Sequence, residues 1–317
     1  MKHIVAACLV AFAAAGATAQ SYPSRPIRIL VGFAPGGAAD ITARLLGEKF
    51  TASMGANVVV DNRTGATGII ATDIVAKSAP DGHTLGVFAL SFAINPSVRK
   101  LPYDTERDFT PVTITATVPL VLVVTNSLPA KNIRELIDLA KVKANALSVA
   151  SSGVGSSPHL TAELFQLMTG VRMQHIAYKG STAAHPELIA GQVQVMFDTI
   201  IATTQLIKSG RLRALGVTSK NRSAEFPDVP AVAESVPGYE STSWGVLIAP
   251  AKVPAPIIDK LNREAVRALQ LPDVRERIAR LGAEVVGNTP AEARKFLGEE
   301  VAKWAKTVKA AGITIEQ

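Results

Sequence analysis

The sequence predicts an α/β fold arranged in two lobes, and three observations lead to it. Apolar, β-rich runs alternate with segments of helical periodicity along most of the chain, beginning with the run at residues 27–33. Turns rich in glycine and serine separate many of these runs and segments, as at Pro35-Gly36-Gly37. This alternation favours mainly parallel sheets with helices on both faces. The 317 residues are too many for one small sheet and are enough for about two domains.

The expected elements follow from periodicity and from breaker residues. Strands are expected over residues 27–33, 57–61, 83–90, 119–125, 147–150, 173–178, 193–197, 213–218 and 244–249. Helices are expected near residues 41–50 and over 69–79, 132–143, 183–190, 203–209, 255–270, 273–281 and 291–310, with a further helix that opens at Ser157 as N-cap and Pro158 as first residue. Proline and glycine at 226–239 indicate a crossing or boundary segment. We expect residues 20–123 plus 244–317 to form lobe I, and 124–243 to form lobe II.

The N-terminus has the three parts of a secretory signal peptide. Lys2 supplies positive charge, an apolar run of 12 residues spans 4–15, and Ala17-Thr18-Ala19 offers a cleavage site. Spanning a membrane takes about 20 apolar residues, so an anchor is disfavoured. We therefore expect residues 1–19 to be a signal peptide, cleaved near Ala19, and the mature protein to be periplasmic. The only cysteine, Cys8, lies inside this segment, so a mature chain without it has no disulfide and no thiol nucleophile.

Composition and motifs argue against several function classes. The net charge of +7 is spread over scattered basic residues and aromatics are 5% of the chain, which disfavours nucleic-acid binding. The sequence contains no G-x-G-x-x-G, P-loop, G-x-S-x-G or H-E-x-x-H motif and no metal-ligand spacing. We expect no cofactor, no metal and no catalytic residue. An exported hydrolase or isomerase stays an alternative, and it requires His159 beside Ser156 or Ser157 with an acid behind it.

Three glycine turns after strands are the candidate ligand site: the first turn (residues 33–40), the second turn (62–68) and the third turn (151–157). The N-terminus of a helix leaves backbone N–H groups free and directs the positive end of its dipole at one point, so such turns bind anions. Ligands of α/β sheets sit at the carboxyl ends of strands, where all three turns lie. The candidate residues in them are Phe33, Pro35, Gly36, Gly37, Ala38, Asp40, Thr64, Gly65, Ala66, Thr67, Gly68, Ser152, Gly155 and Ser156.

Other candidates follow strands or these turns. Ser91 follows the strand at 83–90, and Tyr178 and Gly180 follow the strand at 173–178. His159 either reaches the ligand or is a packing or capping histidine, and Asp198 either orients a polar ligand group or caps the next helix. Asp40 likewise either caps the first helix or holds a ligand ammonium.

Seven segments of the chain together resemble the Bug family, the solute receptors of tripartite tricarboxylate transporters. They are YPSRPI at 22–27, FAPGGAAD at 33–40, VVVDNRTGATGIIA at 58–71, PDGHTL at 80–85, ASSGVGSSPHLTAELF at 150–165, AYKGSTAAHPELIAGQVQVMFD at 177–198 and KAAGITIE at 309–316. The chain departs from the family pattern at Thr64, where relatives usually have proline, and at Ile69, often asparagine.

The resemblance implies a type II periplasmic-binding fold of two doubly wound lobes with two crossing segments. It implies that the first and second turns hold a ligand carboxylate through backbone groups and bound waters. The expected ligand is a small carboxylate: a di- or tricarboxylate, an acidic amino acid or an aromatic acid. The expected partners are subunits of a membrane transporter or, alternatively, a sensor kinase, and we expect the receptor to be a monomer and not an enzyme.

Overall fold

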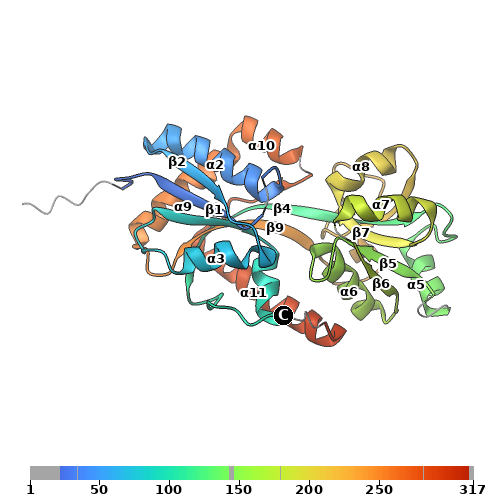
Figure 1. Ribbon diagram of the computed structural model, residues 1–317. Helices are drawn as coiled ribbons and strands as arrows, with labels where there is room; N and C mark the ends of the chain where they lie inside the picture. Colours follow the sequence, from blue (N-terminus) through green and yellow to red (C-terminus); the bar gives the residue numbers. More distant parts are fainter. Residues whose placement is uncertain (1–21, 34, 143–145, 179, 281, 314–317) are drawn as a thin grey trace, which may run out of the picture.

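The computed structural model describes residues 22–33, 35–142, 146–178, 180–280 and 282–313. The predicted signal peptide, Ala34 of the first turn and Lys179 lie outside them. Two lobes are joined by two long strands, β4 (Phe109–Thr125) and β9 (Thr242–Pro250), which run from one lobe towards the other (Figure 1). The prediction of an α/β fold with two lobes and two crossing segments is confirmed.

Lobe I is built on one sheet with strand order β2-β1-β3-β9-β4, and a short strand β10 (Glu284–Val285) pairs with β4. Strands β1 (Ile27–Val31), β2 (Val58–Asn62) and β3 (Thr84–Ala89) are parallel. Val31 is in register with both Asn62 and Val87. The carboxyl ends of these strands therefore meet at one edge, where the first and second turns begin.

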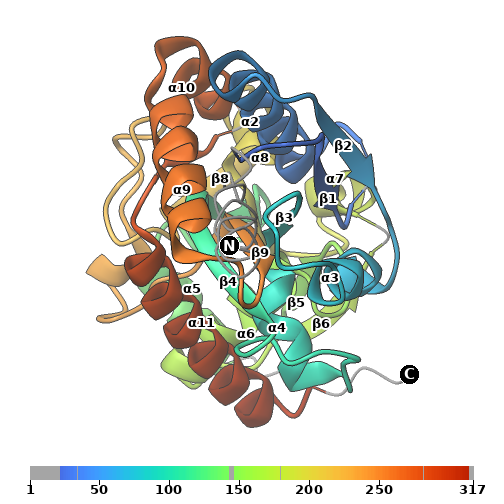
Figure 2. The same cartoon turned by 90° about the vertical axis from the view of Figure 1, so that its left-hand side faces the viewer.

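Helices cover both faces of this sheet because successive strand residues point to opposite faces (Figure 2). Ile29 and Val31 of β1 pack into one core and Leu30 into the other. The first core is covered by α2 (Ala38–Met54), α9 (Ala255–Gln270) and α10 (Pro272–Ala279). The second is covered by α3 (Ile69–Ala76), α4 (Ser91–Val98) and α11 (Pro290–Ala311). The C-terminal helices thus lie on lobe I.

Lobe II repeats this arrangement on a second sheet. Its strands are β5 (Ser148–Ser151), β6 (Gln174–Ala177), β7 (Val195–Thr199) and β8 (Leu212–Val217), together with the end of β4. Its helices are α5 (Ile133–Val142), α6 (Ser157–Thr169), α7 (Ser181–Ala190) and α8 (Ile200–Lys208). β5 pairs with β6 and β7 in parallel, so the carboxyl ends of all three share one edge. Alternate residues of β4 enter the two cores of this lobe, as Leu122 and Val123 do.

β4 passes from one sheet to the other between Pro119 and Leu120. Pro119 is still in register with Thr242 of β9, whereas Leu120 is in register with Thr199 of β7. The expected lobe boundaries after residue 123 and before residue 244 fall within these crossing strands and stay a prediction. The segment 226–239 contains a short 3₁₀ turn (η2, Val232–Glu234) and packs into the cores of lobe II, before the crossing.

Three local expectations were wrong. β4 begins at Phe109, ten residues before the predicted start at 119. α4 was missed because it is only eight residues long and contains Pro96, so its sequence shows no clear helical periodicity. The N-cap of α6 is Ser156, not Ser157, since the Ser156 side chain accepts the His159 N–H. No helix in the described ranges is long and apolar enough to cross a membrane.

Candidate functional site

The first and second turns lie against each other at the edge of the lobe I sheet. A Cβ atom on Gly32 would lie only 2.6 Å from the Cα of Gly68, so glycine at 32 permits this close approach of two backbones. The Asn62 side-chain amide donates to the Phe33 carbonyl oxygen at 2.9 Å. The two turns therefore form one continuous main-chain surface.

The buried Asp40 side chain is hydrogen-bonded to the first turn. It is 2% exposed, and its carboxylate accepts the Gly36 N–H at 2.9 Å and the Asn62 amide at 3.0 Å. Arg44 forms an ion pair with it at 2.9 Å. Burial raises the pKa of Asp40, but the hydrogen bonds from Arg44, Gly36 and Asn62 outweigh burial and hold that pKa below its ordinary value. The carboxylate is thus fully engaged within the protein, which favours the structural role over contact with a ligand ammonium.

The first turn leaves backbone donors unused. Gly37 is the N-cap of α2, and no side chain caps it. The N–H groups of Gly37, Ala38 and Ala39 have no acceptor among the described residues, and the first two of these positions are exposed, as Pro35 is. N–H groups without a described acceptor at the positive end of a helix favour the approach of an anion, and α2 is 17 residues long.

The second turn presents its N–H groups through an unusual backbone. Gly65, Ala66, Thr67 and Gly68 all have positive φ, at 134°, 46°, 52° and 91°. The N–H groups of Ala66 and Thr67 have no acceptor among the described residues, and residues 64–67 are exposed. Thr67 donates its hydroxyl to Asn95 Oδ1 at 3.2 Å. The turn therefore offers main-chain donors, and this hydroxyl is not available as one.

Asn95 was missed in the sequence analysis. It lies on α4, the helix that was not predicted, inside an apolar stretch. The only available signal was a polar residue soon after the carboxyl end of a predicted strand. Ser91, which was selected for that reason, is the first residue of α4 and lies at the same sheet edge as the first two turns.

The third turn uses its backbone donors within lobe II. Gly155 N–H donates to His159 Nδ1 at 3.1 Å, and Ser156 N–H donates to the Gly153 carbonyl at 3.2 Å. Gly180 N–H donates to the Ser152 carbonyl at 3.3 Å. The expectation that Gly155, Ser156 and Gly180 offer free N–H groups is therefore wrong, because these groups already have acceptors.

His159 is a packed, buried histidine. It is 4% exposed and stacks on His175 with ring centroids 3.8 Å apart. Burial, followed by the charge of His175, lowers the pKa of His159 to about 3, and burial also lowers the pKa of His175. Because Nδ1 of His159 accepts the Gly155 N–H, its proton is on Nε2, which lies 3.7 Å from Glu163 Oε1.

The arrangement around His159 does not support the hydrolase alternative. Ser156 Oγ donates to the Gly153 carbonyl at 2.7 Å and accepts the His159 backbone N–H. Neither ring nitrogen of His159 forms a hydrogen bond with a serine hydroxyl in the described structure. A Ser151–His175 hydrogen bond of 2.7 Å exists, but Ser151 is 0% exposed and cannot meet a substrate.

Tyr178 and Asp198 also bond within lobe II. The Tyr178 hydroxyl donates to Glu187 at 2.6 Å, and burial together with Glu187 raises the pKa of Tyr178 to about 12. Asp198 is 1% exposed. One of its carboxylate oxygens accepts a hydrogen bond from Ser181 Oγ, and the other lies 2.8 Å from His185 Nε2. Asp198 thus ties β7 to α7. It is not the cap of α8, whose N-cap residue is Thr199.

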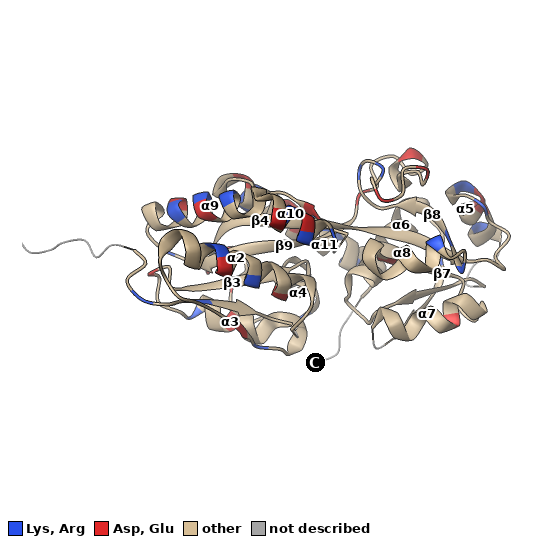
Figure 3. Ribbon diagram, turned by 90° about the horizontal axis from the view of Figure 1, so that it is seen from above, with Lys and Arg blue, Asp and Glu red and all other residues tan. Residues whose placement is uncertain are grey.

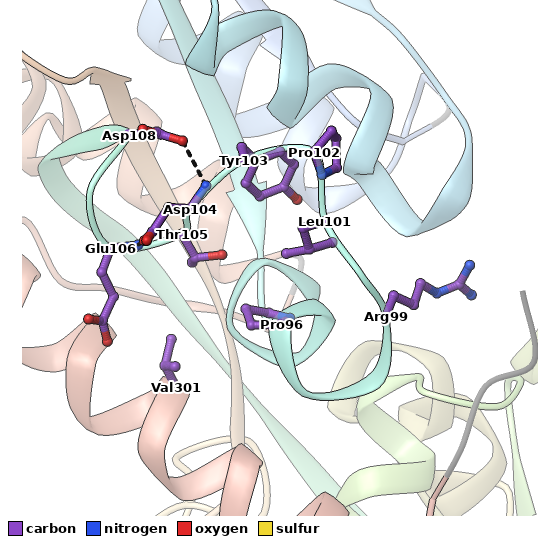
Figure 4. Close-up of a pocket in the computed structure, with 10 residues that line it drawn as sticks. All are labelled: Pro96, Arg99, Leu101, Pro102, Tyr103, Asp104, Thr105, Glu106, Asp108 and Val301. Atoms are coloured by element: carbon purple, nitrogen blue, oxygen red, sulfur yellow. Dashed lines mark hydrogen bonds between the residues drawn. The ribbon is translucent and has the colours of Figure 1, made fainter.

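A surface hollow separate from these turns lies on lobe I. Its volume is about 680 Å³, and it lies between the α4–β4 connection and α11 (Figure 4). Its lining residues include none of the predicted site: Pro96, Arg99, Leu101, Pro102, Tyr103, Asp104, Thr105, Glu106, Asp108 and Val301. A cavity of about 60 Å³ does touch the first turn, at Ala38 and Ala39, and is also lined by Thr115 and Gly245 of the crossing strands.

Charges of both signs are interspersed on the outer helices, as along α9, and form no basic stripe there (Figure 3). Within the described residues, no group of three or more His, Cys, Asp or Glu side chains is placed to hold a metal ion.

Known proteins share this fold and sequence. The family described as "Tripartite tricarboxylate transporter family receptor" matches residues 42–313. BugT of Bordetella pertussis (strain Tohama I) is 39% identical over 310 residues, which is 96% of this chain and 94% of BugT. The structure of R. palustris Rpa4515 with adipate has a TM-score of 0.78 at 35% identity, covering 93% of this chain and 100% of that chain. The periplasmic binding protein BugD has a TM-score of 0.75 at 36% identity, with the same coverage.

Proposed function

Since this chain belongs to the tripartite tricarboxylate transporter receptor family, as its resemblance to the Bug proteins predicted, we propose that it binds a small carboxylate through the main chain of its first and second turns. The family is one of solute receptors, not enzymes. The observation that carries the proposal is the contact of two exposed turns whose N–H groups, at Gly37, Ala38, Ala66 and Thr67, have no acceptor among the described residues.

The nearby basic side chains are already paired with acidic residues, which supports binding of the ligand carboxylate by the main chain. Arg44 is paired with the buried Asp40 at 2.9 Å, and Arg63 is paired with Asp61 at 3.0 Å. Both guanidinium groups thus have carboxylate partners inside lobe I. The positive potential for a ligand carboxylate then comes from backbone N–H groups and the α2 dipole. A related receptor binds adipate, so dicarboxylates are the first ligand class to test.

We further propose that residues 1–19 direct export and that the receptor delivers its ligand to the membrane subunits of a tripartite transporter. The charged, apolar and small-residue parts of that segment support export, and the family supports the partner.

A thermal-shift screen with matched ligands tests the proposal. The panel contains adipate, malate, citrate, glutamate and nicotinate, with the uncharged adipamide as the control for adipate. Ligand at 100 times its Kd should stabilise the protein by about 2.7 kcal/mol. Melting curves that none of the acids shifts, or that adipate and adipamide shift equally, would contradict the carboxylate proposal.

Gly37→Val tests whether the first turn binds the ligand. Gly37 has φ −78° and ψ 167°, a conformation that valine adopts, so the fold should survive with the loss of about 1 kcal/mol for a poor N-cap residue. The isopropyl group should block approach to the first turn and raise Kd at least tenfold by calorimetry. An unchanged Kd would show that the first turn does not bind the ligand.

A further inference from the structure

The backbone of the second turn is held in a conformation that its residues do not favour. Ala66 and Thr67 have φ values of 46° and 52° with no glycine at either position. A left-handed conformation is unfavourable for a non-glycine residue because Cβ comes too close to the following carbonyl oxygen. Two such residues in succession persist only when surrounding contacts impose the conformation.

One buried side chain makes those contacts. Asn95 Oδ1 accepts the Thr67 hydroxyl at 3.2 Å, and Asn95 Nδ2 donates to the Thr67 backbone carbonyl at 3.3 Å. The amide orientation follows from chemistry, because a carbonyl oxygen can only accept. Both ends of one amide therefore hold one residue, fixing the direction of the peptide group that follows it.

Asn95 is itself firmly placed. It is 3% exposed, and its neighbours Phe92 and Ile94 pack in the core of lobe I. Other described hydrogen bonds of the turn lie on either side of Thr67: Gly68 N–H donates to the Gly65 carbonyl at 2.9 Å, and Ile69 N–H donates to the Ala66 carbonyl. Thr72 Oγ donates to the Gly68 carbonyl at 2.9 Å. None of these bonds has Thr67 as its donor or acceptor.

We propose that Asn95 is a positioning residue for ligand binding: it clamps Thr67 in the left-handed conformation and thereby keeps the Ala66 and Thr67 N–H groups directed outward for the ligand. This role rests on the proposed carboxylate-binding function. Asn95 does not touch the ligand; it acts through Thr67. An amide supplies one donor and one acceptor on two different atoms without adding a negative charge next to the carboxylate site.

A matched pair of variants separates positioning from general stability. Asn95→Ala removes the clamp. Asn262→Ala is the control, because Asn262 Nδ2 also joins segments of lobe I, donating to the Val112 and Asn288 carbonyls at 2.8 and 2.9 Å, away from the turns. Both variants should lower Tm, whereas only Asn95→Ala should raise the Kd for adipate, at least tenfold. Equal Kd changes in the two variants, or none in Asn95→Ala, would overturn the proposal.

A double-mutant cycle tests the route through Thr67. Thr67→Gly relieves the strain, since glycine adopts positive φ freely. In this background Asn95→Ala should change the Kd for adipate less than threefold. If the two substitutions instead raise Kd additively, Asn95 does not act through Thr67.

A measurement without ligand keeps this proposal separate from the carboxylate proposal. ¹⁵N relaxation on the ligand-free protein should give Ala66 and Thr67 amide order parameters near 0.85 in the parent and below about 0.6 in Asn95→Ala. Asn262→Ala should leave both values unchanged. If no carboxylate binds the parent, the proposed function fails, while this result still decides whether Asn95 orders the turn; unchanged order parameters would refute it.

Discussion

The first turn of lobe I and the third turn of lobe II are similar in sequence but differ in how they use their N–H groups. Both follow a strand, contain two glycines and open a helix. In the first turn, the N–H groups of Gly37 and Ala38 have no described acceptor. In the third turn, Gly155 and Ser156 donate to acceptors in their own lobe.

The difference lies in which N–H groups of each turn donate to a nearby side chain. Asp40 accepts the Gly36 N–H of the first turn, and no described residue accepts the N–H groups of Ala38 and Ala39 that follow it. His159 lies near the start of α6. Its Nδ1 accepts the Gly155 N–H, which would otherwise be available to a ligand. A glycine turn at a helix start therefore offers donors to an anion only where some of its N–H groups have no acceptor within the protein. Among the described residues, the first and second turns of lobe I have such N–H groups, whereas those of Gly155 and Ser156 in lobe II bond within their own lobe.

Gly32→Val should break the lobe I site most severely. A Cβ at this position would lie 2.6 Å from Gly68 Cα, so the first and second turns must separate. We expect the Kd for the best ligand of the panel to rise at least a hundredfold, about 2.7 kcal/mol, and stability to fall by about 1–3 kcal/mol. Gly298→Ala, on α11 with open space around the new methyl group, is the control and should leave Kd unchanged. A Gly32→Val protein that binds normally would show that contact between the turns is not needed.

Acid should act on lobe II through His159. Its folded pKa of about 3 lies below the ordinary value of 6.5, so the unfolded chain takes up the proton first. The stability from neutral, buried His159 is fully present above pH 6.5 and is lost by about 1.4 kcal/mol per unit as pH falls from 6.5 towards 3. In His159→Asn, whose Oδ1 can accept the Gly155 N–H, chemical denaturation between pH 7 and 4 should show a shallower decline. The same slope in both proteins would exclude His159 as the source.

Tyr178→Phe should have the smallest effect on ligand affinity. It tests whether lobe II contributes the Tyr178 hydroxyl to ligand binding. It removes the hydrogen bond of 2.6 Å to Glu187, which is exposed and weak in water. Titration calorimetry should give a Kd within twofold of the parent. A tenfold loss would mean that the Tyr178 hydroxyl leaves Glu187 to bind the ligand.

Much of the fold was predictable because strong periodic signals carry it. The helix expected at 255–270 coincides with α9, whose apolar face is regular and whose start is marked by Pro254. β4 was underestimated because Thr110, Thr113 and Thr115 interrupt its apolar pattern, although it is buried between neighbouring strands. α4 is only eight residues long and contains Pro96, so its sequence shows no clear helical period.

The backbone positions of the site were predictable from the sequence, but their hydrogen-bond partners were not. Glycine and helix-start signals located all three turns, since they are local. Which donors stay free depends on Asp40, His159 and Asn95, whose side chains reach acceptors or donors that only tertiary structure places. Asn95 lies 28 residues from Thr67 in the chain, so no local pattern joins them.

The crossing strands determine how the lobes can move against each other. β4 is a single strand of 17 residues that belongs to both sheets, and β9 is paired with it up to Pro119. Any rotation of one lobe against the other would therefore twist this hydrogen-bonded pair of strands, whose register shifts lie between Pro111 and Thr113 and between Ile114 and Ala116. The free energy needed to twist the two strands would be subtracted from the affinity of any ligand that binds only when the lobes are brought together.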